Sequence, residues 1–275
     1  TPYGTRSFEV VYQYTWQCVK KLFEMDCELV ILACNTASAK ALRSIQQNEL
    51  LHYYSNRRVL GVIRPTAERV DALTKTRVVG LVATDGTVQS NSYSLEVGKL
   101  FPDIQVINQA CPMWVPLIEN NEHQSAGADF FVKKYLDQLL AKNASIDTLI
   151  LGCTHYPLLL QKIEHYLPSH IHIVTQGNIV ADSLADYLER HPEIEQACRR
   201  QRQHDQHHGA AHAARCVGKW PAPIHRVARH AGLPVLSAVL ARASLRALSM
   251  ASIRSACASE RDLTRSFLRR LRSSS

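Results

Sequence analysis

Two short stretches of the chain resemble each other, and they constrain the fold more than any other feature. Each is an apolar run followed by a small residue, a cysteine and polar residues, namely LVILACNTAS over residues 29–38 and TLILGCTHYP over residues 148–157. Apolar runs of this length predict buried parallel strands, because both faces of such strands are covered. The residues after the cysteines, Asn35, Thr36 and Thr154, suit the first positions of a helix.

This setting favours a functional position for Cys34 and Cys153. Each cysteine directly follows a predicted strand, and ligands bind at the carboxyl ends of strands in open α/β sheets. A lone cysteine at such a place is usually a core residue, but the repeated context favours function for this pair. The partial positive charge of a helix N-terminus favours thiolate over thiol, so we expect a lowered pKa for both.

Strand-like runs alternate with helical patterns along the first 190 residues. Strands are predicted over residues 29–33, 59–63, 77–83, 104–107, 149–151 and 171–174, with helices between them. Within these connections, Pro65 is expected to open a helix, residues 84–87 to form a tight turn, and Asp182 to lie in the first turn of a helix. The alternation predicts an α/β fold with two pseudo-symmetric, doubly wound parallel-sheet domains and the active site between them.

The two similar motifs also suggest how the chain is divided. We expect residues 1–64 to form the first α/β domain, residues 65–175 the second, and residues 176–198 to return to the first. No apolar run is long enough to span a bilayer, and no signal peptide is recognisable, so we expect no membrane partner. The chain begins at Thr1 rather than Met, which suggests a fragment whose true start lies upstream.

Residues 199–275 differ in composition from the rest. They hold 15 Lys and Arg against 3 Asp and Glu, whereas residues 1–198 hold 17 and 21. Three interpretations are open: a basic arm for nucleic acid, a metal-binding histidine tract, or a frame-shifted or artefactual segment. The abrupt change at one position favours the third, so we expect no nucleic-acid partner. The eight cysteines contain no C-x-x-C pair, which argues against a disulfide scaffold and favours a reducing cytoplasm.

Both cysteine motifs are similar to the signature motifs of the aspartate/glutamate racemase family. This similarity rests on Cys34-Asn-Thr-Ala and Gly152-Cys-Thr-His-Tyr-Pro157. Further motifs, taken in order, resemble the glutamate racemase branch: Pro2-Tyr-Gly4, Gly80-x-x-x-Thr84-x-Gly-Thr87 and Cys111-Pro followed by Val115-Pro-Leu-Ile-Glu119. The resemblance covers about residues 2–190. It implies a cytoplasmic, cofactor-independent enzyme without a metal, which acts on a small amino acid and is often a homodimer.

The chemistry of this family agrees with the residues themselves. Racemisation removes a Cα proton on one face and returns one on the other, and a thiol with a pKa near ~8.5 can serve as base or acid. By resemblance, Cys34 and Cys153 are the two bases, and His155 assists Cys153 and contacts the substrate. The residues implied to hold the substrate are Tyr3, Gly4, Asn35, Thr36 and Thr154, with Glu119 and Thr87 lining the same region.

One departure from the family concerns the first cysteine. Family members carry an Asp-Ser-Gly motif whose aspartate partners that cysteine, and no such motif occurs in this chain. Losing a general-base partner costs about 10²- to 10⁴-fold, so we expect poor activity. D-glutamate formed by such an enzyme would supply peptidoglycan synthesis.

Three alternative functions stay open. The chain could be a racemase of aspartate or another amino acid, a metal hydrolase with Cys34, Cys153 and His155 as ligands, or an inactive binding module with a basic arm.

Overall fold

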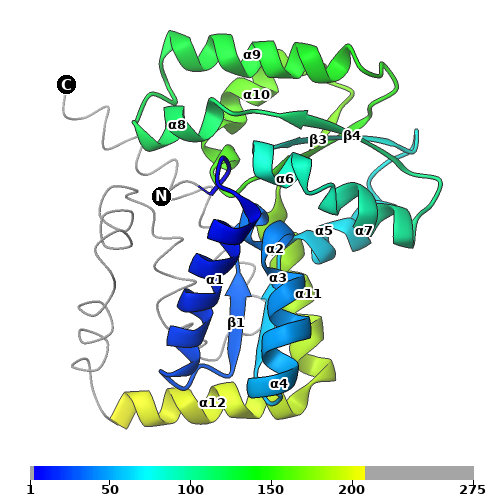
Figure 1. Cartoon of the computed structure of the whole chain (residues 1–275). Helices are drawn as coiled ribbons and strands as arrows, with labels where there is room; N and C mark the ends of the chain where they lie inside the picture. Colours follow the sequence, from blue (N-terminus) through cyan, green and yellow to red (C-terminus); the bar gives the residue numbers. More distant parts are fainter. Residues whose placement is uncertain (1–2, 208–275) are drawn as a thin grey trace.

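The computed structural model describes residues 3–207, which form two parallel β-sheets with helices packed around them (Figure 1). The smaller sheet pairs β1 (Leu29–Leu32) with β2 (Arg58–Gly61). The larger sheet has the strand order β4-β3-β5-β6, with bounds Gln105–Ala110, Val78–Ala83, Thr148–Gly152 and His172–Val174. Every strand pair is parallel. The α/β fold predicted from the alternating pattern is confirmed.

The smaller sheet is covered by the first helices of the chain. They are α1 (Phe8–Phe23), α2 (Asn35–Lys40), α3 (Leu42–Ser44), a π-helical segment (Ile45–Leu50) and α4 (Leu51–Tyr53). Val19 and Phe23 of α1 pack with Val30, Ile45 and Val59 in one buried cluster. The helical region after β1 extends to residue 53.

The larger sheet carries a hydrophobic core on each face. One cluster, which includes Trp114, Leu139, Leu149 and Tyr156, lies under α8 (Trp114–Glu119), α9 (Ala126–Leu140) and α10 (Leu160–Tyr166). The other, which includes Val79, Leu81, Tyr93 and Ile150, lies under α5 (Ile63–Arg69) and α7 (Ser92–Leu100). Strand β5 is buried along its whole length, as expected for a parallel strand covered on both faces.

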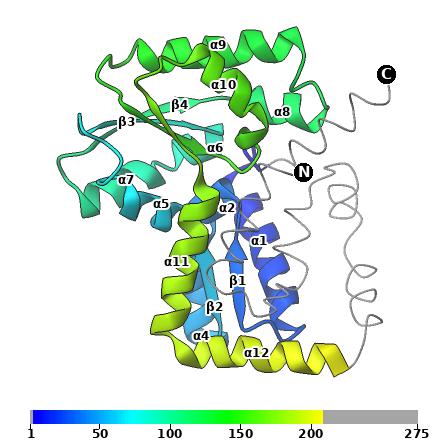
Figure 2. The same cartoon turned by 180° about the vertical axis from the view of Figure 1, so that it is seen from behind.

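The last described helices, α11 (Gln176–Arg190) and α12 (Pro192–His207), run back beside the smaller sheet (Figures 1 and 2). The domain boundaries at residues 64 and 175 stay a prediction. Helix α12 continues through residue 199, where the composition changes, and the rest of the predicted tail, residues 208–275, lies outside the described residues. None of the helices in residues 3–207 combines the length and apolar character that crossing a membrane requires.

Three local predictions were wrong. Residues 84–87 do not form a tight turn: Thr84 is the N-cap of α6 (Asp85–Gln89), and its Oγ1 accepts a hydrogen bond from the Thr87 amide at 3.4 Å. Helix α5 begins at Ile63, so Pro65 is its third residue rather than its opening. Helix α11 begins at Gln176, which places Asp182 in the second turn rather than the first.

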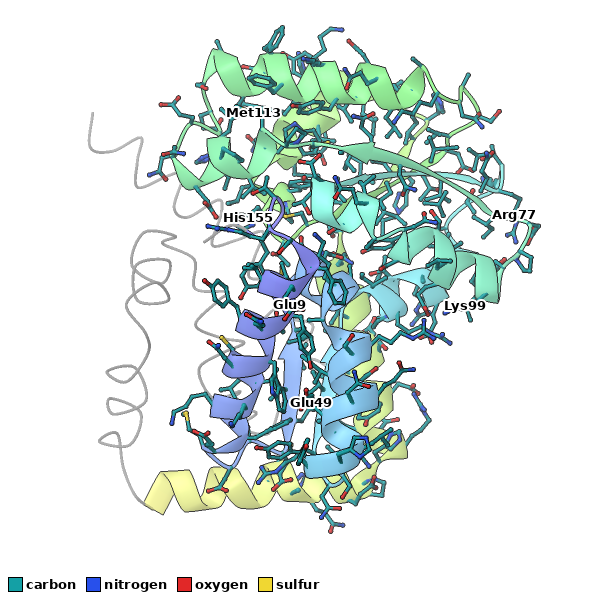
Figure 3. All side chains as sticks on the ribbon, in the orientation of Figure 1. Glu9, Glu49, Arg77, Lys99, Met113 and His155 are labelled. Atoms are coloured by element: carbon teal, nitrogen blue, oxygen red, sulfur yellow. The ribbon has the colours of Figure 1, made fainter. Side chains whose placement is uncertain are left out.

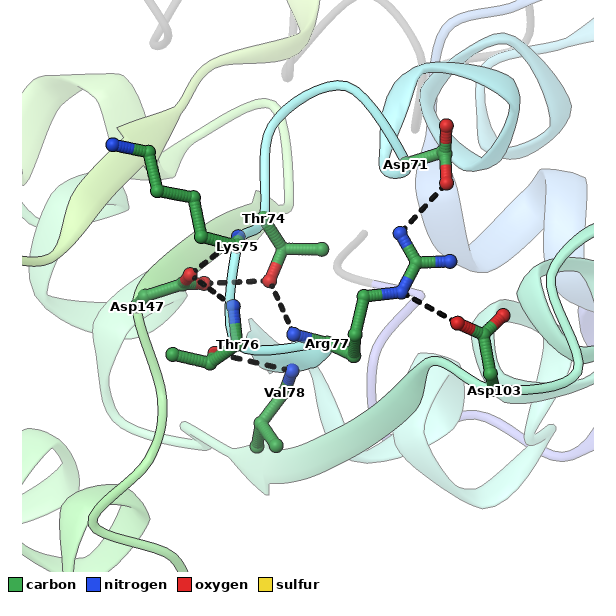
Figure 4. Close-up of polar contacts among 8 residues, drawn as sticks. All are labelled: Asp71, Thr74, Lys75, Thr76, Arg77, Val78, Asp103 and Asp147. Carbon is green, nitrogen blue, oxygen red and sulfur yellow. Dashed lines mark hydrogen bonds and ion pairs between the residues drawn. The ribbon is translucent and has the colours of Figure 1, made fainter.

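Charged and polar groups are paired at the amino ends of the strands in the larger sheet. Arg77 lies at these amino ends, on the opposite side of the larger sheet from His155 (Figure 3). Its guanidinium makes ion pairs with Asp71 at 2.7 Å and with Asp103 at 2.6 Å (Figure 4). These pairs connect the loop before β3 to the loop before β4.

Asp147 holds the same loop from the amino end of β5 (Figure 4). Its carboxylate accepts hydrogen bonds from the Thr74 hydroxyl at 2.7 Å and from the amides of Lys75 and Thr76 at 2.6 and 2.8 Å. Burial alone raises the pKa of the Asp147 carboxyl, but these hydrogen bonds outweigh burial and hold the pKa well below its usual value.

Candidate active site

Cys34 joins the end of β1 to the start of α2. It is the N-cap residue of α2, and its Sγ accepts a hydrogen bond from the Ala37 amide at 3.5 Å. The Ser38 hydroxyl donates to the Leu32 carbonyl at 2.9 Å, so the first turn of α2 is tied to the strand that precedes it. Cys34, a residue of intermediate exposure, thus occupies the strand end that the sequence predicted.

Cys153 directly follows β5 in the larger sheet and is 8 % exposed. A Cβ on Gly152 would lie 2.8 Å from the Leu81 Cδ1 and 3.2 Å from the Val82 carbonyl, so a larger residue here would require these neighbours to shift. The next residues form a turn and then a short 3-10 helix (Tyr156–Leu159). Thr154 is exposed in that turn and does not begin a helix, which corrects the sequence-based expectation.

His155 lies between Cys153 and Glu119. Its Nδ1 is 3.7 Å from the Cys153 Sγ, and its Nε2 is 3.5 Å from the Glu119 carboxylate on α8. Burial lowers the pKa of the His155 imidazole, while Glu119 acts in the opposite direction. An Nε2–H group directed at the carboxylate leaves Nδ1 as an acceptor facing the thiol.

The thiol pKa values depart from the expectation of lowered values. Burial raises the pKa of the Cys34 thiol, although hydrogen bonds from Ala37 and Thr36 act against it. Burial also raises the pKa of Cys153, to about 12, and the charge of Cys34 adds to this effect while the His155 and Tyr156 amides oppose it. Desolvation therefore outweighs the helix N-termini at both positions. The charge of Cys34 is among the causes that raise the Cys153 pKa, which indicates that the two thiols lie near each other.

Three threonine hydroxyls meet beside Cys34. The Thr36 Oγ1 lies 2.8 Å from that of Thr84 and 3.2 Å from that of Thr87, and the last two are 3.1 Å apart. All three residues are buried. Thr36 and Thr87 were singled out from the sequence, whereas Thr84 was expected only as part of a turn. This cluster brings together α2 and α6, which follow strands of different sheets.

The segment with Tyr3 and Gly4 packs against the same turn of α6. The Gly4 carbonyl accepts a hydrogen bond from the Gly86 amide at 2.8 Å, and a Cβ on Gly86 would lie only 2.9 Å from that carbonyl. Burial raises the pKa of the Tyr3 phenol to about 12, and the charges of Cys18 and Cys34 contribute. Tyr3 and Gly4 therefore lie near Cys34 and the threonine cluster.

Asn35 is 2 % exposed, and its side-chain amide has partners inside the protein. Its Nδ2 donates to the Gln176 Oε1 at 2.6 Å, and its Oδ1 accepts from the Tyr93 hydroxyl at 2.7 Å. Sequence reasoning missed Gln176 and Tyr93. For Gln176 the available signal was a polar residue two positions after the end of β6, as Cys34 lies two positions after the end of β1.

The zinc-hydrolase alternative gains no support from this geometry. Among residues 3–207, no three His, Cys, Asp or Glu side chains gather closely enough to hold a metal ion. Cys34, Cys153 and His155 thus do not form a ligand set in the described part of the chain.

A family model described as Asp/Glu/Hydantoin racemase matches residues 2–184, which include both cysteine motifs. The chain belongs to this family. The resemblance seen in the motifs is thereby confirmed. The match ends before α12, so the Arg-rich residues that follow lie outside it.

Named relatives lie in the glutamate racemase branch. The chain is 37 % identical over 187 residues to a glutamate racemase of Geobacter metallireducens, a match that covers 68 % of this chain and 66 % of the relative. The structure is similar to a glutamate racemase isoform of Bacillus anthracis, with a TM-score of 0.63 and 34 % identity over 69 % of this chain and 68 % of that one. The chain thus spans about two thirds of the length of these relatives.

A further solved structure carries a ligand. The glutamate racemase of Francisella tularensis in complex with D-glutamate has a TM-score of 0.61 and 30 % identity, over 70 % of this chain and 68 % of that one. That D-glutamate is bound to the relative and not to this chain.

Proposed function

We propose that the chain racemises glutamate by proton transfer at Cα between Cys34 and Cys153. What supports this most is the placement of two thiols at the carboxyl ends of strands from two different sheets, with the charge of Cys34 among the causes that raise the Cys153 pKa. The names of the relatives favour glutamate over other amino acids. Aspartate or another amino acid of similar size is the alternative substrate.

The reaction needs one thiolate and one thiol. The thiolate takes the Cα proton, and the C–H electron pair stays on the substrate, where the adjacent carboxylate delocalises it. The opposite thiol then gives its proton to the other face of Cα, which leaves it as the new thiolate. The reverse direction exchanges the two roles, so the protein is ready for the opposite enantiomer after each turnover.

Cys153 has a partner for its proton. His155 is held by Glu119 with Nδ1 toward the sulfur, an arrangement of nucleophile, base and orienting carboxylate. Separations of 3.5 and 3.7 Å are long for hydrogen bonds, and such contacts tighten when substrate binds. In this proposal His155 assists Cys153 and contacts the substrate.

The raised thiol pKa values fit a site that is activated by its substrate. Desolvation favours the neutral thiols at both positions. The ammonium group of a bound amino acid would supply a positive charge and stabilise a thiolate beside it. The protein would then form its base when substrate is present.

The substrate's polar groups would be held by the residues that surround Cys34. Thr36, Thr84 and Thr87 present hydroxyl groups that can donate to a carboxylate, and their present partners are one another. Thr154, which follows Cys153 at the end of the larger sheet, is exposed and can contact a ligand from that side. The remaining residues assigned to substrate binding are Tyr3, Gly4, Asn35 and His155.

The cellular setting in this proposal follows the resemblance to bacterial racemases. D-glutamate would be supplied to peptidoglycan synthesis in the cytoplasm, without a cofactor. A homodimer is the expected assembly.

The test is chiral analysis of the full 275-residue chain incubated with L-glutamate, with L-aspartate in a parallel reaction. We expect D-glutamate to accumulate and aspartate to stay unchanged. Conversion of aspartate alone would assign the alternative substrate. If neither amino acid is racemised, the proposed activity is wrong.

A further inference from the structure

A closed ring of hydrogen bonds lies directly behind Cys34. The Asn35 Nδ2 donates to the Gln176 Oε1 at 2.6 Å, the Gln176 Nε2 donates to the Tyr93 hydroxyl at 2.6 Å, and that hydroxyl donates to the Asn35 Oδ1 at 2.7 Å. Asn35 and Tyr93 are 2 % and 1 % exposed, and Gln176 is 9 % exposed. Each member donates to the next, so the ring has a single direction.

The ring is also anchored to α5. The Gln176 Nε2 lies 2.8 Å from the Thr66 hydroxyl, which in turn donates to the Val62 carbonyl at 3.0 Å. Thr66 is fully buried. Rotation of the Gln176 amide alone would place its Nε2 against the Asn35 Nδ2 donor and its Oε1 against the Val62 carbonyl. In a buried network this leaves polar atoms unpaired, which is costly.

Four helices meet through these side chains. Asn35 is the first residue of α2, Tyr93 lies on α7, Gln176 is the first residue of α11, and Thr66 lies on α5. In the sequence, helix α2 follows β1 of the smaller sheet. Helix α7 lies between β3 and β4 of the larger sheet, and α11 follows β6 of that sheet. The ring therefore connects the two sheets at the residue that follows Cys34.

We propose that Tyr93 and Gln176 are positioning residues for proton transfer at Cys34. By fixing the Asn35 side chain they fix the first turn of α2, and with it the direction of the Cys34 Sγ, which is the N-cap of the same helix. A displacement of about 1 Å at a reacting group can cost on the order of 10²-fold in rate. This inference rests on the proposed two-thiol reaction.

The role can be tested by measuring Cα hydrogen exchange in deuterium oxide separately from L- and D-glutamate. The Cys34→Ser variant of the full chain first identifies the enantiomer whose exchange depends on Cys34. We expect Tyr93→Phe, which removes only the hydroxyl, to lower exchange from that same enantiomer by about 10- to 100-fold. Exchange from the other enantiomer should change much less.

Two further variants ensure that the result does not depend on a folding defect in a single variant. Gln176→Met removes both ring contacts of Gln176, and Thr66→Val removes the anchoring hydroxyl with little change of volume. Both should act on the same enantiomer as Tyr93→Phe, with the smaller effect for Thr66→Val. Tyr135→Phe is the matched control, because Tyr135 is also buried but belongs to the core cluster on the other face of the larger sheet.

The outcomes separate this inference from the proposed function. Equal loss of exchange from both enantiomers would mean that the ring only stabilises the fold, and unchanged exchange would mean that it has no role. Either result overturns the positioning of Cys34 while Cys34→Ser still acts on one enantiomer. If the unsubstituted chain exchanges neither enantiomer, the proposed racemisation fails, and the positioning role fails with it.

Discussion

The balance between desolvation and hydrogen bonding is opposite at the two ends of the larger sheet. At the amino ends, hydrogen bonds to Asp147 outweigh desolvation and hold its pKa far below the usual value. At the carboxyl ends, desolvation wins, and the pKa of Cys153 rises to about 12 while that of His155 falls. The protein stabilises the charged form of Asp147 at one end, whereas at the other end its hydrogen bonds only partly offset the desolvation of Cys153.

This difference indicates which end serves stability and which serves chemistry. A carboxylate whose charge the protein already stabilises gains little from a ligand, whereas in the proposed reaction the neutral Cys153 thiol would ionise when a positively charged substrate group binds. Perturbed groups of this second kind concentrate at functional sites. The comparison predicts that substitutions at the carboxyl end affect the reaction and that substitutions at the amino end affect unfolding.

The largest effect is expected at the two thiols. Cys34→Ser and Cys153→Ser should each lower kcat/KM for glutamate racemisation by about 10²- to 10⁴-fold, because a serine hydroxyl is a much weaker acid than a thiol. Thermal unfolding should change little. Cys27→Ser is the control, since Cys27 precedes β1 at the opposite end of the strand from Cys34. Near-normal activity in both site variants would rule out the two-thiol reaction.

A smaller effect is expected at His155. His155→Asn should lower Cα exchange from the enantiomer that depends on Cys153 by about 10- to 100-fold, because the Nδ1 acceptor facing the sulfur is lost. Glu119→Gln should act in the same direction and less, since it disturbs only the orientation of the imidazole. A loss that is equal for both enantiomers would argue against a specific partnership with Cys153.

The smallest effect on activity is expected at Asp147. Asp147→Asn should leave kcat/KM unchanged and lower the free energy of unfolding at neutral pH by about 1 to 2 kcal/mol, a figure reduced for partial solvation. Asn would direct an NH₂ group at donors that the carboxylate now accepts from. Asp137→Asn, on the exposed face of α9, is the matched control and should cost less.

The Asp147 contribution should also depend on pH. Its pKa in the folded protein is depressed, so the stabilisation is fully present above the unfolded pKa of ~3.9 and is lost as pH falls toward the folded value. Urea unfolding of both proteins between neutral pH and pH ~3 should therefore show the difference between them shrinking in acid. A difference that stays constant with pH would show that the Asp147 charge is not responsible.

The parts of the site that lie next to each other in sequence could be predicted. Apolar runs followed by a small residue located both Cys34 and Cys153 at strand ends, because burial of a parallel strand leaves a clear local pattern. His155 follows Cys153 by two positions, so its proximity was also local. The α/β fold was predicted for the same reason, since strands and helices alternate with distinct periodicities.

The remaining features depend on contacts between distant segments. Gln176 contacts Asn35 across 141 positions, and nothing in the local sequence of either residue indicates the other. The thiol pKa values were predicted in the wrong direction because burial is a property of the whole fold, and the helical turns after the cysteines are short. Residues 84–87 are compatible with both a turn and a capped helix. In the structure they form the helix, and the Gly4 carbonyl, which is distant in sequence, lies against Gly86.

The most direct test of the account is a crystal structure of this chain with bound glutamate. If the two thiols exchange protons with one carbon, the Cys34 and Cys153 sulfur atoms should lie on opposite faces of Cα, each about 3 to 3.5 Å away. Glutamate bound with both sulfurs on one face, or with either sulfur out of contact with Cα, would contradict the two-thiol reaction.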